Sequence, residues 1–441
     1  MPYENERASG DSLIWLENSQ ALKEFEDTIL VKEGDTPVEP PTLQLHRRNW
    51  YPRRVIAIDG SNLIHRVNNG FPGAEAGLLM TSVVAIKLDQ LKNLDTGAIP
   101  RPSFFRDIEK AHTLEAAMPG IGIVRKDIKD DTPINFFRQK TYDTISNAIA
   151  ENHETLLETL HYICRAADFQ TNIDCPAIDC EKKYERKAGE YTCHCPRRET
   201  MFETDILRLH EYFDGVRTGG EALGRLRSVL EILILLNILR FFVNKSPNYL
   251  DTCAFVLDGP LAIFGTPASI LRPIREELKR LNEKARKANG SDIVVFGVEK
   301  TGRFKEHWEQ LDWQDGVGPG SRFSEQTVIA LNDEYIKNNI VPADKKGKPF
   351  GEDTHFGRSI LYKTNKGEHV VIHTAMLNSI SEDFRNNSLE CYPRLEDVLD
   401  VVDQLATHIY DGGFMPLVRA HSHAAIPLKR GTDIIKSLLE D

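Results

Sequence analysis

Two apolar segments that each run into Asp-Gly decide the fold of this chain: VIAIDGSN (Val55–Asn62) and AFVLDGPL (Ala254–Leu261). A continuous apolar run that ends in a turn signal is typical of a strand buried at the centre of a sheet. A carboxylate at the end of such a strand is costly to bury alone, so Asp59 and Asp258 need a partner. Aspartates from two neighbouring strands provide oxygen ligands for the divalent cations used in phosphodiester chemistry. The alternative is that each Asp-Gly only starts a turn.

Strands and helices are mixed along the rest of the chain. The expected strands are Val55–Asp59, Gly77–Leu88, Gly120–Lys126, Thr252–Asp258, Asp292–Lys300 and a hairpin turning at Asn365–Gly367. The expected helices are Thr132–Asp168, Gly220–Phe242, Ser269–Ala288, Arg394–Tyr410 and Pro416–Ala425. Residues 1–45 are an acidic segment with a Pro-rich linker, and residues 46–441 are expected to form one domain. This mixture predicts an α/β fold in which helices flank a mixed sheet.

The composition is that of a folded protein without a bulk positive charge. Of 441 residues, 41% are hydrophobic and 27% are charged, and the net charge is −11. Contacts with phosphate must therefore come from local patches. The most apolar run, Val229–Val243, is too short to span a membrane and contains Glu231, Asn237 and Arg240. No signal peptide is visible and the seven cysteines are an odd number, so we expect a cytoplasmic protein.

A third carboxylate and a histidine are candidates for the same site. Glu231 is the acidic residue of the most apolar run, so it needs either a cation or a compensating partner, for which Arg227 is the simpler explanation. Glu221 is the fallback. Near the C-terminus, His421 and His423 lie about 200° apart on a helix, so one of them is expected to point at the site. A histidine there is suited to binding a metal or moving a proton.

Four cysteines lie in a polar insertion of about residues 169–200: Cys175, Cys180, Cys193 and Cys195. Two close pairs of thiols joined by a polar loop suit a tetrahedral zinc ion, and four protein ligands indicate a structural site. His194 is a possible substitute for one cysteine. The alternative is a set of reduced thiols without metal.

Taken in order, these motifs resemble the NurA nuclease family. The residues that carry the resemblance are Asp59-Gly60-Ser61, Glu231, Leu257-Asp258-Gly259-Pro260-Leu261, Gly297–Arg303 and Pro416-Leu417-Val418-Arg419-Ala420-His421. They are scattered over roughly Val55–Pro427. The chain departs from the family in reading Asp-Gly-Pro at the second aspartate, in a longer interval between Glu231 and Asp258, and in having Phe414, with Tyr410 nearby, where the family tends to have tyrosine.

The resemblance implies a ribonuclease-H-like core in a homodimeric enzyme that cuts DNA with a divalent metal, typically manganese. It implies that Asp59, Glu231 and Asp258 bind this metal and that His421 takes the catalytic position near the C-terminus. It also implies a partner, the hexameric ATP-driven DNA translocase HerA, with which the family processes DNA ends. The resemblance does not account for the Cys-rich insertion.

Two basic patches flank the proposed metal residues. Residues 272–305 contain ten Lys or Arg against five acids, among them Lys300 and Arg303, and Arg53 and Arg54 come shortly before Asp59. We therefore expect these four basic residues to contact DNA. The sequence as a whole predicts a Mn²⁺- or Mg²⁺-dependent DNA nuclease in end processing, repair or antiviral (anti-phage) defence. The alternatives are a non-catalytic adaptor that binds DNA or the translocase, and a phosphohydrolase of small molecules.

Overall fold

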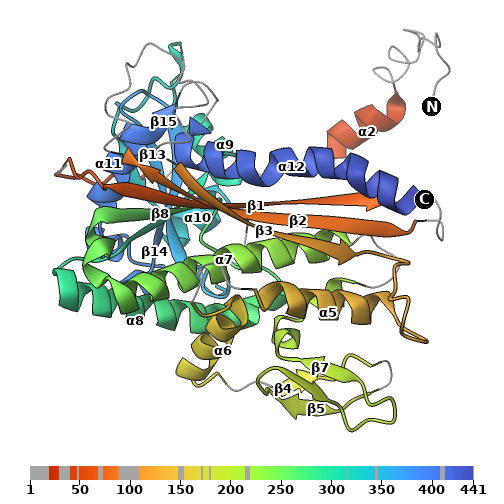
Figure 1. Ribbon diagram of the computed structural model, residues 1–441. Coiled ribbons are helices and arrows are strands. Elements are labelled where there is room, and N and C mark those ends of the chain that lie inside the picture. Colours follow the sequence, from red (N-terminus) through yellow and green to blue (C-terminus); the bar gives the residue numbers. More distant parts are fainter. Residues whose placement is uncertain are drawn as a thin grey trace. The chain divides into compact units, whose positions relative to one another are not determined.

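An eight-stranded mixed sheet forms the core of the chain in the computed structural model (Figure 1). Its strands are β1 (Arg54–Arg66), β2 (Glu75–Lys87), β3 (Glu109–Pro119), β8 (Cys253–Asp258), β9 (Val294–Glu299), β12 (Val328–Ala330), β13 (Gly357–Lys363) and β14 (His369–Ala375). Their order across the sheet is β12-β13-β14-β9-β8-β1-β2-β3. The pairs β1–β8 and β8–β9 are parallel, and the other pairs are antiparallel.

The structure describes residues 19–28, 40–46, 49–67, 73–88, 109–147, 153–169, 172–177, 180–213, 219–314, 316–342, 346–407 and 413–440. The chain divides into two compact units, Met1–Glu39 and Pro40–Asp441. The described part of the first unit is helix α2 (Gln20–Thr28), and most of the predicted acidic segment lies outside the described residues, as does Tyr410.

The second unit contains eight further helices within its described residues: α5 (Pro133–Ile145), α6 (Leu156–Ala166), α7 (Gly220–Lys245), α8 (Leu271–Asn289), α9 (Arg303–Leu311), α10 (Asp333–Asn339), α11 (Leu395–Leu405) and α12 (Met415–Glu440). Its small two-stranded sheets pair β4 (Asn172–Asp174) with β5 (Lys183–Glu185), β6 (Glu190–Thr192) with β7 (Thr200–Phe202), β10 (Trp313–Gln314) with β11 (Gly318–Pro319), and β15 (Ala406–Thr407) with β16 (Gly413–Phe414). None of the described helices is both long and apolar enough to cross a bilayer.

Helices cover both faces of the large sheet because the central strands bury both of their faces. In β1, Ile56 and Ile58 pack into the core that contains α7, whereas Val55 and Ala57 pack into the core that contains α11 and α12. Figure 1 shows α12 lying along β1 and β2 on one side of the sheet, with α7 and α5 on the other. The expected α/β fold with a mixed sheet flanked by helices is therefore confirmed. The antiparallel run β3-β2-β1 followed by the parallel strands β8 and β9 is the ribonuclease-H-like order.

Two details of the predicted strands are wrong. The first strand does not stop at Asp59: β1 continues to Arg66, because β2 goes on pairing with it after its partner β8 has ended. The segment Gly120–Lys126 is not a strand but follows one. The chain turns at Gly120, where an added Cβ would lie 2.4 Å from the carbonyl oxygen of Glu75. The strand that pairs with β2 is β3, which comes before this turn and is more polar.

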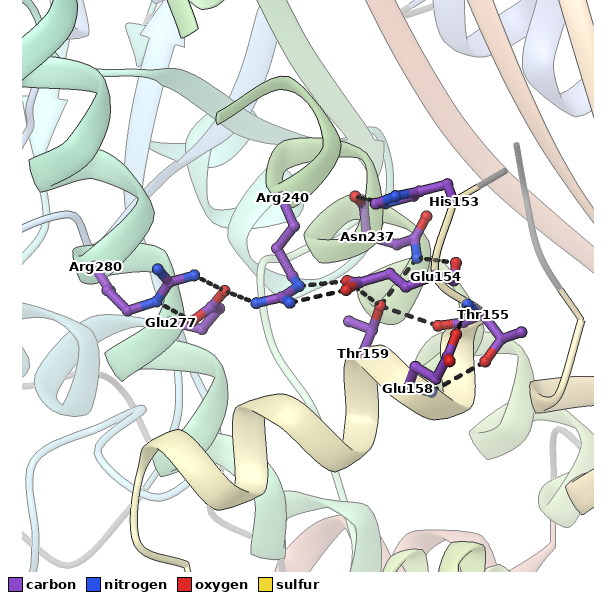
Figure 2. Close-up of polar contacts among 9 residues, drawn as sticks. All are labelled: His153, Glu154, Thr155, Glu158, Thr159, Asn237, Arg240, Glu277 and Arg280. Carbon is purple, nitrogen blue, oxygen red and sulfur yellow. Dashed lines mark hydrogen bonds and ion pairs between the residues drawn. The ribbon is translucent and has the colours of Figure 1, made fainter. Parts of the chain in front are cut away.

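A buried network of charges holds α7 against its neighbours (Figure 2). The guanidinium of Arg240 in α7 donates to Glu277 of α8 at 2.8 Å and to Glu154, just before α6, at 2.8 Å. Arg280 shares Glu277, and the amide of Asn237 donates to the backbone of Glu154 at 2.9 Å. The network fixes the position of α7 two to three turns beyond Glu231, and so helps to hold that residue in place.

We expect Arg240→Met to lower the free energy of unfolding by about 3–5 kcal/mol, because it leaves two carboxylates without their buried partner. The measurement is urea unfolding of the variant beside wild type. Arg280→Met is the matched control, since Arg280 contacts the same Glu277 from a more exposed position and should cost clearly less. Equal losses for the two variants would contradict this role of Arg240.

Candidate metal and DNA site

Asp59 and Asp258 lie side by side on neighbouring parallel strands. The register of β1 and β8 pairs Ile58 with Leu257, and each aspartate is the next residue along its strand. Behind Asp258 the chain turns at Gly259 (φ +89°), whose carbonyl oxygen would lie 2.3 Å from a Cβ at Gly297 in β9. Glycine at 297 therefore lets this turn pass close to β9. The two carboxylates meet where β8 ends, as the sequence predicted.

Glu231 approaches the same place from α7, which packs on the face of the sheet opposite α12. Asp59, Asp258 and Glu231 line one cleft of about 740 Å³. The charged and histidine side chains that complete its lining are Arg227, Glu299, Lys300, Arg303, His355 and His373. The three carboxylates proposed from the sequence thus share a cleft although they are far apart in the chain.

Each of these carboxylates faces a basic side chain. Asp59 Oδ2 lies 2.9 Å from His421 Nδ1, Asp258 Oδ1 lies 3.2 Å from Lys300 Nζ, and Glu231 Oε1 lies 3.5 Å from Arg227 Nε. Within the described part of the chain, no three of these carboxylate or histidine ligand atoms lie within 4.8 Å of one another. The donor set fits a hard divalent cation by type, and a bound cation would compete with these basic partners for the carboxylate oxygens.

Burial and mutual repulsion raise the pKa of two of the carboxyls. For Asp59, burial and the charge of Asp258 raise the pKa above its usual range, and His421 opposes the shift. For Glu231, burial raises the pKa to about 8, with Arg227 opposing and the two aspartates adding to the shift. Carboxyls whose ionisation is opposed by burial and by neighbouring carboxylates are typical of a functional site, and a bound cation would favour their charged form.

The pKa of Glu231 predicts a pH dependence of stability. Its ordinary value is 4.5, so between pH 4.5 and 8 the unfolded chain ionises while the folded chain holds its proton. The contribution of Glu231 to the free energy of unfolding is therefore greatest below pH 4.5, falls as the pH rises from 4.5 to 8, and levels off above pH 8. Between pH 5 and 9, the free energy of unfolding of wild type should fall by roughly 3–5 kcal/mol more than that of Glu231→Gln, in buffer without added Mn²⁺ or Mg²⁺. Urea unfolding of both proteins measures this, and parallel curves would refute it.

The other predicted site residues fall into two groups. Lys300 and Arg303 line the cleft, and His421 contacts Asp59. Outside the cleft lining lie His423, which pairs with Glu109 in β3, and Glu221, which is exposed and pairs with Arg225. Arg53 and Arg54 stand at the start of β1, five or more residues before Asp59, and Arg54 lies over the ring of Tyr249. The structure thus separates Arg53 and Arg54 from the carboxylates.

Several cleft residues were not singled out from the sequence. Glu299 is the last residue of β9 and accepts a hydrogen bond from His373 Nε2 at 3.0 Å. The sequence does contain a signal for Glu299, because it is an acidic residue at the end of an apolar strand, as Asp59 and Asp258 were expected to be. His355 and Phe264 come from loops, and no pattern in the sequence marks them.

The search of solved structures finds NurA nucleases. The NurA nuclease from Sulfolobus solfataricus is 10% identical, with 98% of this chain and 92% of that chain covered and a TM-score of 0.34. A second NurA structure is 10% identical, with 94% and 91% covered and a TM-score of 0.24. No family model and no curated protein matches the chain. The family found is the one that the motifs resemble, and at these TM-scores the chemistry must be argued from the side chains.

The Cys-rich insertion forms a second candidate metal site. The sulfurs of Cys175, Cys180, Cys193 and Cys195 all lie within 4.8 Å of one another. A zinc ion with Zn–S bonds of about 2.3 Å needs sulfurs about 3.8 Å apart, a spacing that lies within this limit. His194 is exposed and stands outside this group.

A backbone amide and a tyrosine hydroxyl lie against the sulfur of Cys193 in the insertion. The amide of Cys195 donates to the sulfur of Cys193 at 3.2 Å, and the hydroxyl of Tyr184 lies 3.0 Å from the same sulfur. A backbone hydrogen bond from Glu199 lowers the pKa of Cys195 to about 6, whereas burial raises the pKa of Cys175. Hydrogen bonds to sulfur, and a cysteine that ionises readily such as Cys195, suit a metal-binding cluster, and a bound metal would favour the thiolate form of the others.

Proposed function

We propose that this chain is a divalent-metal-dependent deoxyribonuclease that cuts phosphodiester bonds at the cleft between β1, β8 and α7. The single observation that carries the proposal is the shared cleft of Asp59, Glu231 and Asp258, which Lys300 and Arg303 also line. A bound Mn²⁺ or Mg²⁺ would supply a Lewis acid and lower the pKa of water beside the phosphate. The carboxylates would hold that ion, and the basic side chains would attract the DNA backbone.

His421 has the geometry of a proton carrier in this proposal. Its Nδ1 is hydrogen-bonded to Asp59, and its ring is half-exposed, so Nε2 is free to face a substrate. Asp59 would fix the orientation and the tautomer of the ring. The exposed Nε2 could then give a proton to the leaving oxygen.

The test is the degradation of end-labelled single- and double-stranded DNA by the purified protein. We expect products with Mn²⁺ or Mg²⁺ and none without added divalent ion. The main alternative, a non-catalytic adaptor, predicts DNA binding without products under every metal condition. A phosphohydrolase of small molecules would act on phosphate esters and leave DNA intact.

The partners implied by the motif resemblance belong to the same proposal. They are a second copy of this chain, a HerA-type hexameric ATPase, and a role in DNA end processing, repair or defence against phage in the cytoplasm. Light scattering of the purified protein tests the homodimer. Co-purification with a HerA-type ATPase, and DNA cutting that rises when ATP is added, test the partnership.

The cysteine cluster is proposed to hold a structural zinc ion. Four sulfur ligands leave no open position on a tetrahedral ion, so this zinc would stabilise the fold and take no part in cutting. Three of the four cysteines are buried with Ile173 and Met201 in a hydrophobic core that also contains residues of α5, α6 and α7. The insertion therefore packs against these helices.

A further inference from the structure

The contact between Arg227 and Glu231 is loose. Both lie on α7, four residues apart, and both line the cleft. Besides the 3.5 Å contact of Nε with Glu231, one terminal nitrogen of Arg227 reaches the carbonyl oxygen of Gly60 at 3.4 Å. Nε itself is buried and has no hydrogen-bond partner in the described part of the chain. A guanidinium offers five donors, and most of those of Arg227 are poorly used.

Other arginines of this chain make much closer pairs. Arg138 grips Asp205 through two nitrogens at 2.9 and 2.6 Å, and Arg280 grips Glu277 at 2.7 and 2.6 Å. Both are the two-pronged contacts that a guanidinium and a carboxylate prefer. The Arg227 side chain also remains 38% exposed. Its pairing is therefore not that of an arginine committed to a carboxylate.

The position of Arg227 is nevertheless fixed next to the first aspartate. A Cβ at Gly60 would lie 2.6 Å from Cγ of Arg227 and 2.7 Å from Oε1 of Glu231. Since residue 60 directly follows Asp59, its lack of a side chain lets the stem of Arg227 lie against the backbone at the site. The guanidinium is thus held beside the place where a cation and a phosphate would meet.

The charges of the cleft depend on the cation. Four carboxylates (Asp59, Glu231, Asp258 and Glu299) face three basic side chains (Arg227, Lys300 and Arg303). Counted with every group ionised, as a bound cation would favour, these side chains carry one net negative charge, which opposes DNA, and one divalent ion makes the balance positive. A cation held by the carboxylates also competes with the basic groups that now face them.

We propose that Arg227 binds the scissile phosphate: when the carboxylates take up the cation, its guanidinium leaves Glu231 and makes a two-pronged contact with the phosphodiester. This inference rests on the proposed nuclease function and adds a residue to it. The planar fork of arginine matches two phosphate oxygens, and the unused donors of Arg227 supply it.

Two binding measurements on Arg227→Met test this, and neither is a rate. Calorimetry with Mn²⁺ should show affinity that is unchanged or up to about 5-fold higher, because a competing positive charge near the ion is gone. Fluorescence anisotropy with a cleavage-resistant phosphorothioate oligonucleotide and Mn²⁺ should show about 10- to 150-fold weaker binding of DNA. Arg227→Lys, which keeps the charge but not the fork, should fall between.

Arg225→Met is the matched control. Arg225 lies two residues earlier on α7, pairs with Glu221 at 3.4 Å, and is absent from the cleft lining. Both affinities should stay at wild-type values in that variant. Thermal unfolding of all variants checks that they are folded.

The outcomes separate the two proposals. If Arg227 only ordered Glu231, the affinities for Mn²⁺ and for DNA would both fall, and the inference would be wrong. Unchanged DNA affinity in Arg227→Met, in a protein that cuts DNA, would also overturn it while leaving the nuclease function in place. A wild-type protein that neither cuts DNA nor binds Mn²⁺ would overturn both.

Discussion

Asp59→Asn and Asp258→Asn are each expected to slow the cutting of DNA by about 10²–10³-fold or more. Each change removes a charged ligand and leaves an amide of nearly the same shape. Because the pKa of Asp59 is already raised by burial and by Asp258, an uncharged side chain at position 59 should not harm the fold. We therefore expect the thermal unfolding temperature of Asp59→Asn to be at or above that of wild type.

The measurement is the rate of product formation from end-labelled DNA at saturating Mn²⁺, with Mn²⁺ affinity followed by calorimetry. Asp251→Asn is the matched control. Asp251 precedes β8 at the end of the strand away from Asp258, where its carboxylate accepts a hydrogen bond from Ser291. It should cut as wild type does. Near-normal cutting by folded Asp59→Asn and Asp258→Asn proteins would remove the basis of the nuclease proposal.

The sequence predicted the parts of the site that lie on long regular elements. Asp59 and Asp258 end apolar runs, and Glu231 interrupts one, so burial alone marks them as residues that need a partner. Their meeting could be inferred because parallel strands bring equivalent ends to one edge of a sheet. The side-by-side register of β1 and β8 confirms this step.

What the sequence could not show is which basic group faces which acid. Arg227 was considered as an ion-pair partner of Glu231, and helix spacing does bring the two together. The spacing does not reveal that the contact is long or that it lies in the cleft, because both depend on how closely α7 approaches Gly60. Similarly, the strand pattern that predicted β1 could not show that β2 extends the pairing beyond Asp59, since register with a partner is a tertiary property.

The strand after Asp258 ends in an acidic residue that the sequence also marks as a candidate for the site. The segment Asp292–Lys300 was expected as a strand, and the structure has β9 there. Lys300, which follows the strand, was expected to contact DNA, whereas the last strand residue, Glu299, was not singled out. Read by burial alone, an acid at the end of an apolar strand is the same signal that identified the two aspartates.

The second large effect concerns the cysteine cluster: Cys175→Ser and Cys193→Ser should each reduce the zinc content from about one ion per chain to nearly none. A tetrahedral site that loses one of four thiolates loses most of its affinity, and the free energy of metal binding is part of the folding free energy of a small metal-held unit. Besides the cysteines, the short strands β4 to β7 contribute only Ile173 and Met201 to the buried core cluster. We therefore expect proteases to cut within residues 172–202 of these variants.

His194→Ala is the matched control, since this exposed residue lies between Cys193 and Cys195 but outside the sulfur cluster. It should retain its zinc and resist proteolysis as wild type does. Elemental analysis of protein purified without chelators gives the zinc content, and limited proteolysis reports the order of the insertion. Loss of zinc in His194→Ala would make the histidine a ligand in place of a cysteine. If wild-type protein contains no zinc and its insertion still resists proteolysis, core packing alone holds the four thiols together and the zinc proposal is wrong.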